Sequence, residues 1–182
     1  MNDRYGTFRG LVRLRLAQVE VALGQGAIRA GVPAAVRRIV FVCHGNICRS
    51  AFAEVAARQA GINVGSFGLS AGSGRPAHEP AIEAAAAMGH DLTRHRATAL
   101  QDYAPQDGDL LLAMETRQLR RIADDPRLTD LPRSLLGLYT EPRVPHLHDP
   151  YGLSPAYMRT CLRRIESAIP VLKAAFPNAC AD

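Results

Sequence analysis

Hydrophobic residues in this chain form short apolar runs that alternate with stretches of helical spacing. Four runs are typical of buried strands, over residues 38–42, 63–70, 109–114 and 134–139. Helical spacing is found over residues 50–60, 79–88, about 115–122 and 154–176. Within the last stretch, Pro170 should kink the helix or begin a second one. The alternation predicts an α/β fold, a three-layer sandwich with a central four-stranded parallel sheet and helices on both faces.

The first part of the chain carries one further helical pattern, over residues 8–23, which ends at Gly24 and Gly26. Its large apolar residues recur at helical spacing: Phe8, Leu11, Val12, Leu16, Val19 and Leu23. Two interpretations stay open. The helix packs on the surface of the domain, or it contacts an acidic partner or a membrane surface.

Composition narrows the class of protein. The chain has 182 residues, of which 47% are hydrophobic and 21% charged, as in a globular domain with its own core. No apolar run is long enough to span a bilayer, and the first residues lack the pattern of a secretory signal, so we expect no stable membrane insertion. Four cysteines in a chain of this size do not indicate a disulfide scaffold. We therefore expect a reducing, cytoplasmic location.

The positive charge is concentrated at the start of the chain. Residues 1–38 hold seven arginines against Asp3 and Glu20, a net charge of +5, whereas the remainder holds 15 basic and 15 acidic residues. The sequence also lacks the interleaved aromatic and basic residues with which proteins stack bases. We therefore expect no nucleic-acid partner.

The first predicted strand ends in a cysteine, and Cys43-His44-Gly45-Asn46-Ile47-Cys48-Arg49-Ser50 leads from it into a helix. Unpaired N–H groups at a helix N-terminus favour both a thiolate and a bound phosphate. An arginine adds a planar fork that matches two phosphoryl oxygens. Ligands of parallel sheets bind beyond the carboxyl ends of the strands. We therefore predict an active-site loop after the first strand, with Cys43 as nucleophile and Arg49 as phosphate-binding cation.

The other residues of this loop suit the binding of a phosphate. Gly45 lets the backbone curl closely around a ligand, and Asn46 tolerates a left-handed conformation and can brace the loop. A hydroxyl at Ser50 can donate a hydrogen bond to the thiolate. The predicted phosphate-binding residues are His44, Gly45, Asn46, Ile47, Cys48 and Ser50.

Two residues of the loop admit more than one interpretation. Cys48 either forms a reversible disulfide with Cys43, which would protect the thiolate from irreversible oxidation, or fills the loop as a small apolar residue. His44 would favour thiolate and phosphate if protonated, but we interpret it as a neutral side chain that faces solvent.

The loop sequence resembles the signature of the low-molecular-weight protein tyrosine phosphatases of bacteria. The resemblance continues through Ser70-Ala71-Gly72, through residues 109–115 and through Asp149-Pro150-Tyr151, and it covers roughly residues 38–178. Two residues depart from the usual pattern: Ala51 replaces a proline, and His44 replaces a small or apolar residue. Both departures bear on rate and substrate preference, since neither removes a catalytic group.

The resemblance implies a phosphocysteine intermediate, with no metal and no cofactor. It implies that Asp149 is the general acid, presented by a stiff Asp-Pro turn. Tyr151 either lines the entrance and stacks on a phenyl ring or is a plain aromatic residue of the turn. It also implies a division into an N-terminal helical extension, residues 1–37, and a catalytic domain, residues 38–182. The expected partner is a phosphotyrosine protein, for which bacterial tyrosine kinases are one candidate.

Three other functions remain as alternatives to hydrolysis of phosphotyrosine. Arsenate reductases with a similar loop use further cysteines in a later segment, and residues 73–108 contain none. Protein arginine phosphatases resemble this chain but carry threonine where it has Ile47. A catalytically silent phosphate-binding module is disfavoured by the presence of Cys43, Arg49 and Asp149.

Overall fold

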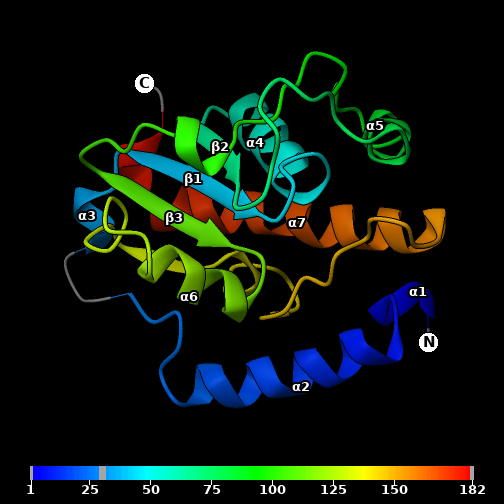
Figure 1. Cartoon of the computed structure of the whole chain (residues 1–182), viewed down its shortest axis with the longest axis horizontal. Helices are drawn as coiled ribbons and strands as arrows, with labels where there is room; N and C mark the ends of the chain where they lie inside the picture. The colour runs from blue at the N-terminus through cyan, green and yellow to red at the C-terminus, as the bar shows by residue number, and fades with distance from the viewer. Residues whose placement is uncertain (1, 29–31, 181–182) are drawn as a thin grey trace.

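The structure, a computed structural model, describes residues 2–28 and 32–180 (Figure 1). The two predicted units, 1–37 and 38–182, therefore include a few positions outside the described residues, namely 1, 29–31, 181 and 182. A four-stranded parallel sheet lies at the centre, with strand order β2-β1-β3-β4. Its strands are β1 (Arg38–Cys43), β2 (Val64–Gly68), β3 (Asp109–Ala113) and β4 (Arg133–Leu135).

Helices cover both faces of this sheet, as the alternation of patterns predicted. They are α1 (Asn2–Tyr5), α2 (Phe8–Ala22), α3 (Val32–Ala35), α4 (Arg49–Gln59), α5 (Glu79–Ala86), α6 (Thr116–Ala123) and α7 (Pro155–Ala175). Short 3-10 turns lie at η1 (Leu100–Asp102), η2 (Leu136–Leu138) and η3 (Pro177–Ala179). The predicted three-layer α/β sandwich is confirmed (Figure 1).

Alternate residues of β1 face two hydrophobic cores, one on each side of the sheet. Ile39 and Phe41 belong to the larger core, which contains the buried faces of α4, α5 and α7. Val40 and Val42 belong to the smaller core, which contains the buried face of α6. Both neighbours of β1 pair with it in parallel register, so its carboxyl end is fixed at Cys43 with Gly68 beside it.

The fourth strand is shorter than the sequence predicted. We expected residues 134–139, but β4 ends at Leu135 and the chain continues into the 3-10 turn η2. A Cβ atom on Gly137 would lie 1.9 Å from the Val144 carbonyl oxygen, so the returning loop packs directly on the backbone here. The Val144 amide donates to the Gly137 oxygen at 2.9 Å, a bond that takes the place of a continued ladder.

Of the two alternatives predicted for Pro170, a kink or a second helix, the second helix is absent. The chain forms one helix, α7, from Pro155 to Ala175. Pro170 lies on its exposed side. The carbonyl group that loses its N–H partner can be hydrated there, so the helix continues.

The predicted N-terminal helix exists as α2, but its large apolar residues do not form the packing face. Gly10 and Ala17 are its buried residues, whereas Phe8, Leu16 and Val19 are exposed. The helix lies close to the domain because its inner residues are small. None of the helices in residues 2–28 and 32–180 is both long and apolar enough to cross a bilayer.

Candidate active site

Cys43 lies at the carboxyl end of β1, and the loop that follows curls back over its side chain. The Cys43 Sγ atom lies 3.0 Å from the Ser50 Oγ atom and accepts a hydrogen bond from the Asn46 amide at 3.2 Å. Residue Cys48 precedes helix α4, and no side chain caps the helix there. The first N–H groups of α4 are therefore available to an anion beside the sulfur.

Asn46 holds the loop in shape through all of its polar atoms. Its backbone has φ +53°, the left-handed conformation that asparagine tolerates. Its Nδ2 group donates to the hydroxyls of Ser50 (2.8 Å) and Ser66 (2.7 Å), and its Oδ1 atom accepts from the Thr98 amide at 2.7 Å. The His95 Nε2 atom lies 2.8 Å from the Asn46 carbonyl oxygen.

These bonds order a chain of donors that ends at the sulfur. Ser66 donates to Glu54 and accepts from Asn46, and Asn46 donates in turn to Ser50. Because the Ser50 oxygen already accepts a hydrogen, its own hydrogen is free to point at Cys43. Such a donor stabilises negative charge on the sulfur.

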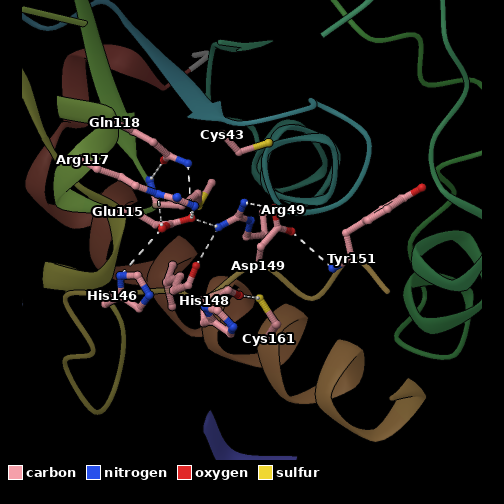
Figure 2. Close-up of polar contacts among 12 residues, drawn as sticks. Cys43, Arg49, Glu115, Arg117, Gln118, His146, His148, Asp149, Tyr151 and Cys161 are labelled. Atoms are coloured by element: carbon pink, nitrogen blue, oxygen red, sulfur yellow. Dashed lines mark hydrogen bonds and ion pairs between the residues drawn. The ribbon is translucent and has the colours of Figure 1, made fainter. Parts of the chain in front are cut away.

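Arg49 is 1% exposed and its guanidinium group is held between two carboxylates (Figure 2). The Nη1 atom of Arg49 donates to the Glu115 Oε1 atom at 2.7 Å and to the Leu147 carbonyl oxygen at 2.8 Å. The Nη2 atom lies 2.7 Å from the Asp149 Oδ2 atom. Burial opposes its charge, but Asp149 and Glu115 outweigh burial and raise the pKa of Arg49.

The Nε atom of Arg49 is buried and has no hydrogen-bond partner. In a buried guanidinium group this leaves one donor free for an anion. Figure 2 shows Cys43 on one side of the guanidinium group and Asp149 on another.

Glu115 belongs to the candidate site, although no role was predicted for it from the sequence. It follows β3, whose carboxyl end lies beside that of β1, and it accepts bonds from Arg49 and from Arg117 Nε (2.8 Å). Burial opposes its charge, yet Arg49 and Arg117 lower the pKa of Glu115 to about 2. An acidic residue directly after the third strand is a signal that sheet topology could have used.

Asp149 lies in the loop before α7 and its side chain is 30% exposed. The preceding residue, His148, is held by contacts with two other segments, helix α7 and the residue before α2. Its carbonyl oxygen accepts a bond from the Tyr157 hydroxyl at 3.3 Å, and its Nε2 atom lies 3.1 Å from the Thr7 Oγ1 atom. Asp149 therefore reaches Arg49 from a supported loop.

The remaining predicted residues lie around the mouth of the loop. His44 is exposed, as we interpreted it, and Ile47 is half-buried against the core. Tyr151 is 57% exposed and its ring packs at 4.7 Å from the ring of His78 (centroid to centroid). In Figure 2 the Tyr151 side chain extends away from Arg49. His78 is a further rim residue that the sequence did not indicate.

Cys43 and Cys48 are both free thiols. Burial raises the pKa of Cys48, and the charges of Asp149 and Cys43 act in the same direction. Cys48 is thus a protonated, buried thiol beside the nucleophile candidate. The predicted regulatory disulfide stays a prediction.

No cluster of three or more metal-ligating side chains occurs among residues 2–28 and 32–180. A cavity of about 770 Å³ lies at the amino ends of β3 and β4, and it is lined by residues 25–28, by Val32, Ala35 and Val36, and by the loop before β4. It contains none of the groups described above. The candidate site is therefore the loop after β1, and its groups suit attack on a phosphate monoester: a nucleophile, an anion-binding loop, a guanidinium group and a carboxyl group.

Comparison with known proteins gives one consistent family. Residues 38–179 match the family described as "Low molecular weight phosphotyrosine protein phosphatase". The probable low molecular weight protein-tyrosine-phosphatase EpsP of Ralstonia solanacearum is 43% identical over 89 residues, which cover 48% of this chain and 61% of that protein. The matched part thus spans about three fifths of that relative.

Two solved structures extend the comparison to the fold. The tyrosine phosphatase AmsI of Erwinia amylovora superposes with a TM-score of 0.68 at 28% identity, covering 82% of this chain and 99% of that one. The YwlE arginine phosphatase of Geobacillus stearothermophilus superposes with a TM-score of 0.64 at 27% identity, covering 76% of this chain and 91% of that one.

Proposed function

This chain belongs to the low molecular weight phosphotyrosine protein phosphatase family, and from that premise we propose that it hydrolyses phosphotyrosine in proteins through a phosphocysteine intermediate. The observation that carries the proposal is the environment of Cys43. Its sulfur faces a loop amide and a serine hydroxyl at the start of a helix whose first residue is Arg49.

In the first step, the Cys43 thiolate attacks the phosphorus atom. The sulfur–phosphorus bond forms as the bond from phosphorus to the tyrosine oxygen breaks. Asp149 gives its proton to the departing oxygen, which leaves as a neutral phenol. The loop amides and Arg49 stabilise the charge on the phosphoryl oxygens throughout.

In the second step, water attacks the phosphocysteine. The Asp149 carboxylate takes a proton from the water, an oxygen–phosphorus bond forms, and the sulfur leaves as a thiolate. Ser50 donates to that thiolate as it leaves, a role that its 3.0 Å separation from the sulfur permits. Inorganic phosphate is released and Asp149 holds a proton again.

The pairing of Asp149 with Arg49 gives the free protein a defined resting state. A bound phosphate dianion would compete for the guanidinium group with the carboxylate, which now lies 2.7 Å from the Nη2 atom. Substrate would thereby displace Asp149 from Arg49 toward the leaving oxygen, and the freed carboxylate takes up from solvent the proton that it then gives to that oxygen. Glu115, which is more deeply buried, would keep the guanidinium group in place.

Turnover of para-nitrophenyl phosphate tests the proposal. Cys43→Ser should abolish turnover and keep the fold, whereas Cys180→Ser, at a partly buried thiol near the C-terminus, should leave the rate unchanged. Asp149→Ala should slow cleavage of phenyl phosphate, whose leaving group needs protonation, by about 10²–10⁴-fold, the usual loss for a positioned proton donor. Normal turnover by Cys43→Ser would exclude this nucleophile.

Phosphoarginine is a second candidate substrate, because one of the solved structures similar to this chain is an arginine phosphatase. The half-buried, apolar Ile47 side chain lies in the loop and offers a phenyl ring a contact that a charged guanidinium group would not share. A phosphotyrosine peptide should therefore be cleaved faster than the matched phosphoarginine peptide. Faster cleavage of the phosphoarginine peptide would show instead that this chain acts as an arginine phosphatase.

We also propose that the chain consists of a catalytic unit and an N-terminal addition. Residues 38–182 would form the catalytic unit, since Cys43, Arg49, Glu115 and Asp149 all lie within it, and residues 1–37 would be an addition to it. A cytoplasmic location suits a catalytic thiolate and four unpaired cysteines. Autophosphorylated bacterial tyrosine kinases are the substrates to test first.

A further inference from the structure

Helix α2 presents an apolar stripe to solvent. Six large hydrophobic side chains are exposed among the described residues, and all but Tyr151 lie on this helix or its last turn: Phe8 (67%), Val12 (41%), Leu16 (59%), Val19 (58%) and Leu23 (81%). They are spaced four, four, three and four residues apart. Because an α-helix turns about 100° per residue, all five lie within an arc of about 80° around the helix axis. Scattered exposed hydrophobics are ordinary, but a continuous stripe indicates a partner.

The stripe cannot turn inward, because the opposite side of α2 is fixed on the domain. A Cβ atom on Gly10 would lie 2.9 Å from the His148 ring, so helix and domain are in direct contact there. Ala17 is fully buried, and near the end of the helix Glu20 pairs with Arg120 of α6. Figure 1 shows α2 at the edge of the molecule, with its outer side free.

Exposed arginines border the stripe on both sides. On the helix, Arg9 and Arg15 lie just outside opposite edges of the apolar arc, and both are exposed. The acidic residue of α2, Glu20, is already paired with Arg120. The outer side of α2 is thus apolar along its centre and cationic along its borders.

We propose that α2 docks this protein onto the surface of a bilayer that contains anionic phospholipids. A convex helix face with cationic borders fits a flat anionic interface, in which the apolar side chains enter the headgroup boundary. A second copy fits less well, since two stripes pairing face to face would bring arginines together with no free carboxylate on either helix. The docking is peripheral and needs no membrane-spanning segment.

Vesicle flotation of the full chain tests this proposal. Vesicles of phosphatidylcholine and phosphatidylglycerol in equal parts should bind the protein at least about 10-fold more than vesicles of phosphatidylcholine alone. Leu16→Ser with Val19→Ser should lose most of that binding, and so should Arg9→Gln with Arg15→Gln. Turnover of para-nitrophenyl phosphate should be unchanged in both variants, since neither touches the candidate site.

A matched control removes two exposed arginines elsewhere, Arg94→Gln with Arg143→Gln, and should bind as the parent protein does. The proposal is overturned if the parent protein does not bind anionic vesicles, or if it binds equally after the Leu16 and Val19 changes. It is also overturned if these changes convert a dimer into a monomer in sedimentation equilibrium while vesicle binding is absent. That result would assign the stripe to a second copy of the chain.

Discussion

Arg49 illustrates how a single residue of this site depends on distant parts of the chain. The sequence placed it at the start of a helix, and it is there. Its partners Glu115 and Leu147 lie 66 and 98 residues further along. No local pattern reports such contacts, which is why the sequence indicates Cys43, Asn46 and Arg49 as candidate site residues but does not indicate Glu115.

A substitution at Glu115 should show how much the buried Arg49–Glu115 ion pair contributes to the stability of the fold. Glu115→Gln leaves Arg49 with one carboxylate fewer in a site that excludes water, and breaking a buried pair in this way costs about 3–5 kcal/mol. We expect a loss of that size in the free energy of unfolding, measured with urea.

The matched control is Arg117→Gln, which removes another partner of the same carboxylate. The Arg117 side chain is 54% exposed, so its loss should cost less than about 1 kcal/mol. Equal losses in the free energy of unfolding would mean that the buried Arg49–Glu115 pair stabilises the fold no more than the exposed Arg117–Glu115 pair does.

At the scale of elements, the β1–loop–α4 unit was predictable because its signals are local. An apolar run, a loop with glycine and asparagine, and an alanine-rich helix follow one another within 22 residues, from 38 to 59. The sequence-based prediction was less accurate where tertiary contacts determine the end of a strand or the packing face of a helix. The return of residues 140–147 onto Gly137 shortened the fourth strand. The packing face of α2 is formed by the small residues Gly10 and Ala17 together with the partly buried Leu14 and Val21, not by the apolar residues that the helical spacing had singled out.

The junction of α1 and α2 supports the loop that carries Asp149. The Thr7 hydroxyl lies 3.1 Å from His148, and a Cβ atom on Gly6 would lie 2.8 Å from the same ring. If Asp149 is the acid, then Thr7 is a positioning residue for it. Thr7→Val should slow cleavage of phenyl phosphate about 3- to 10-fold, with a smaller effect on para-nitrophenyl phosphate, whose leaving group needs little protonation.

Two features of this experiment separate positioning from stability. Thr7 also caps α2, because its Oγ1 atom accepts from the Gly10 amide at 3.0 Å, and loss of a cap costs about 1 kcal/mol. A loss of stability alone would lower both rates equally. Thr7→Ser keeps the hydroxyl and should restore both rates. An equal fold-loss of rate for the two substrates in Thr7→Val would refute the positioning role.

For the molecule as a whole, the same buried groups that shape the site make stability depend on pH. Burial lowers the pKa of His146 from 6.5 to about 4, so this side chain is neutral in the folded protein. The pKa of Glu115 is lowered from 4.5 to about 2. In both cases the unfolded chain binds a proton at a higher pH than the folded one does. Acid therefore favours unfolding, through His146 between pH 6.5 and 4 and through Glu115 below that.

His146→Gln should reduce the first of these two phases, to which the half-buried His148 also contributes because burial lowers its pKa as well. The shift in the pKa of His146 corresponds to about 3 kcal/mol of stability at neutral pH, which is lost as the pH falls through the interval from 6.5 to 4. Urea unfolding at a series of pH values should give a flatter profile for His146→Gln over that interval, with the decline below pH 4 retained. The profile of His146→Gln is compared with that of His44→Gln, which makes the same substitution at an exposed position. A parent protein whose stability is constant from pH 6.5 to 4 would show that His146 is protonated as readily in the folded state as in the unfolded chain.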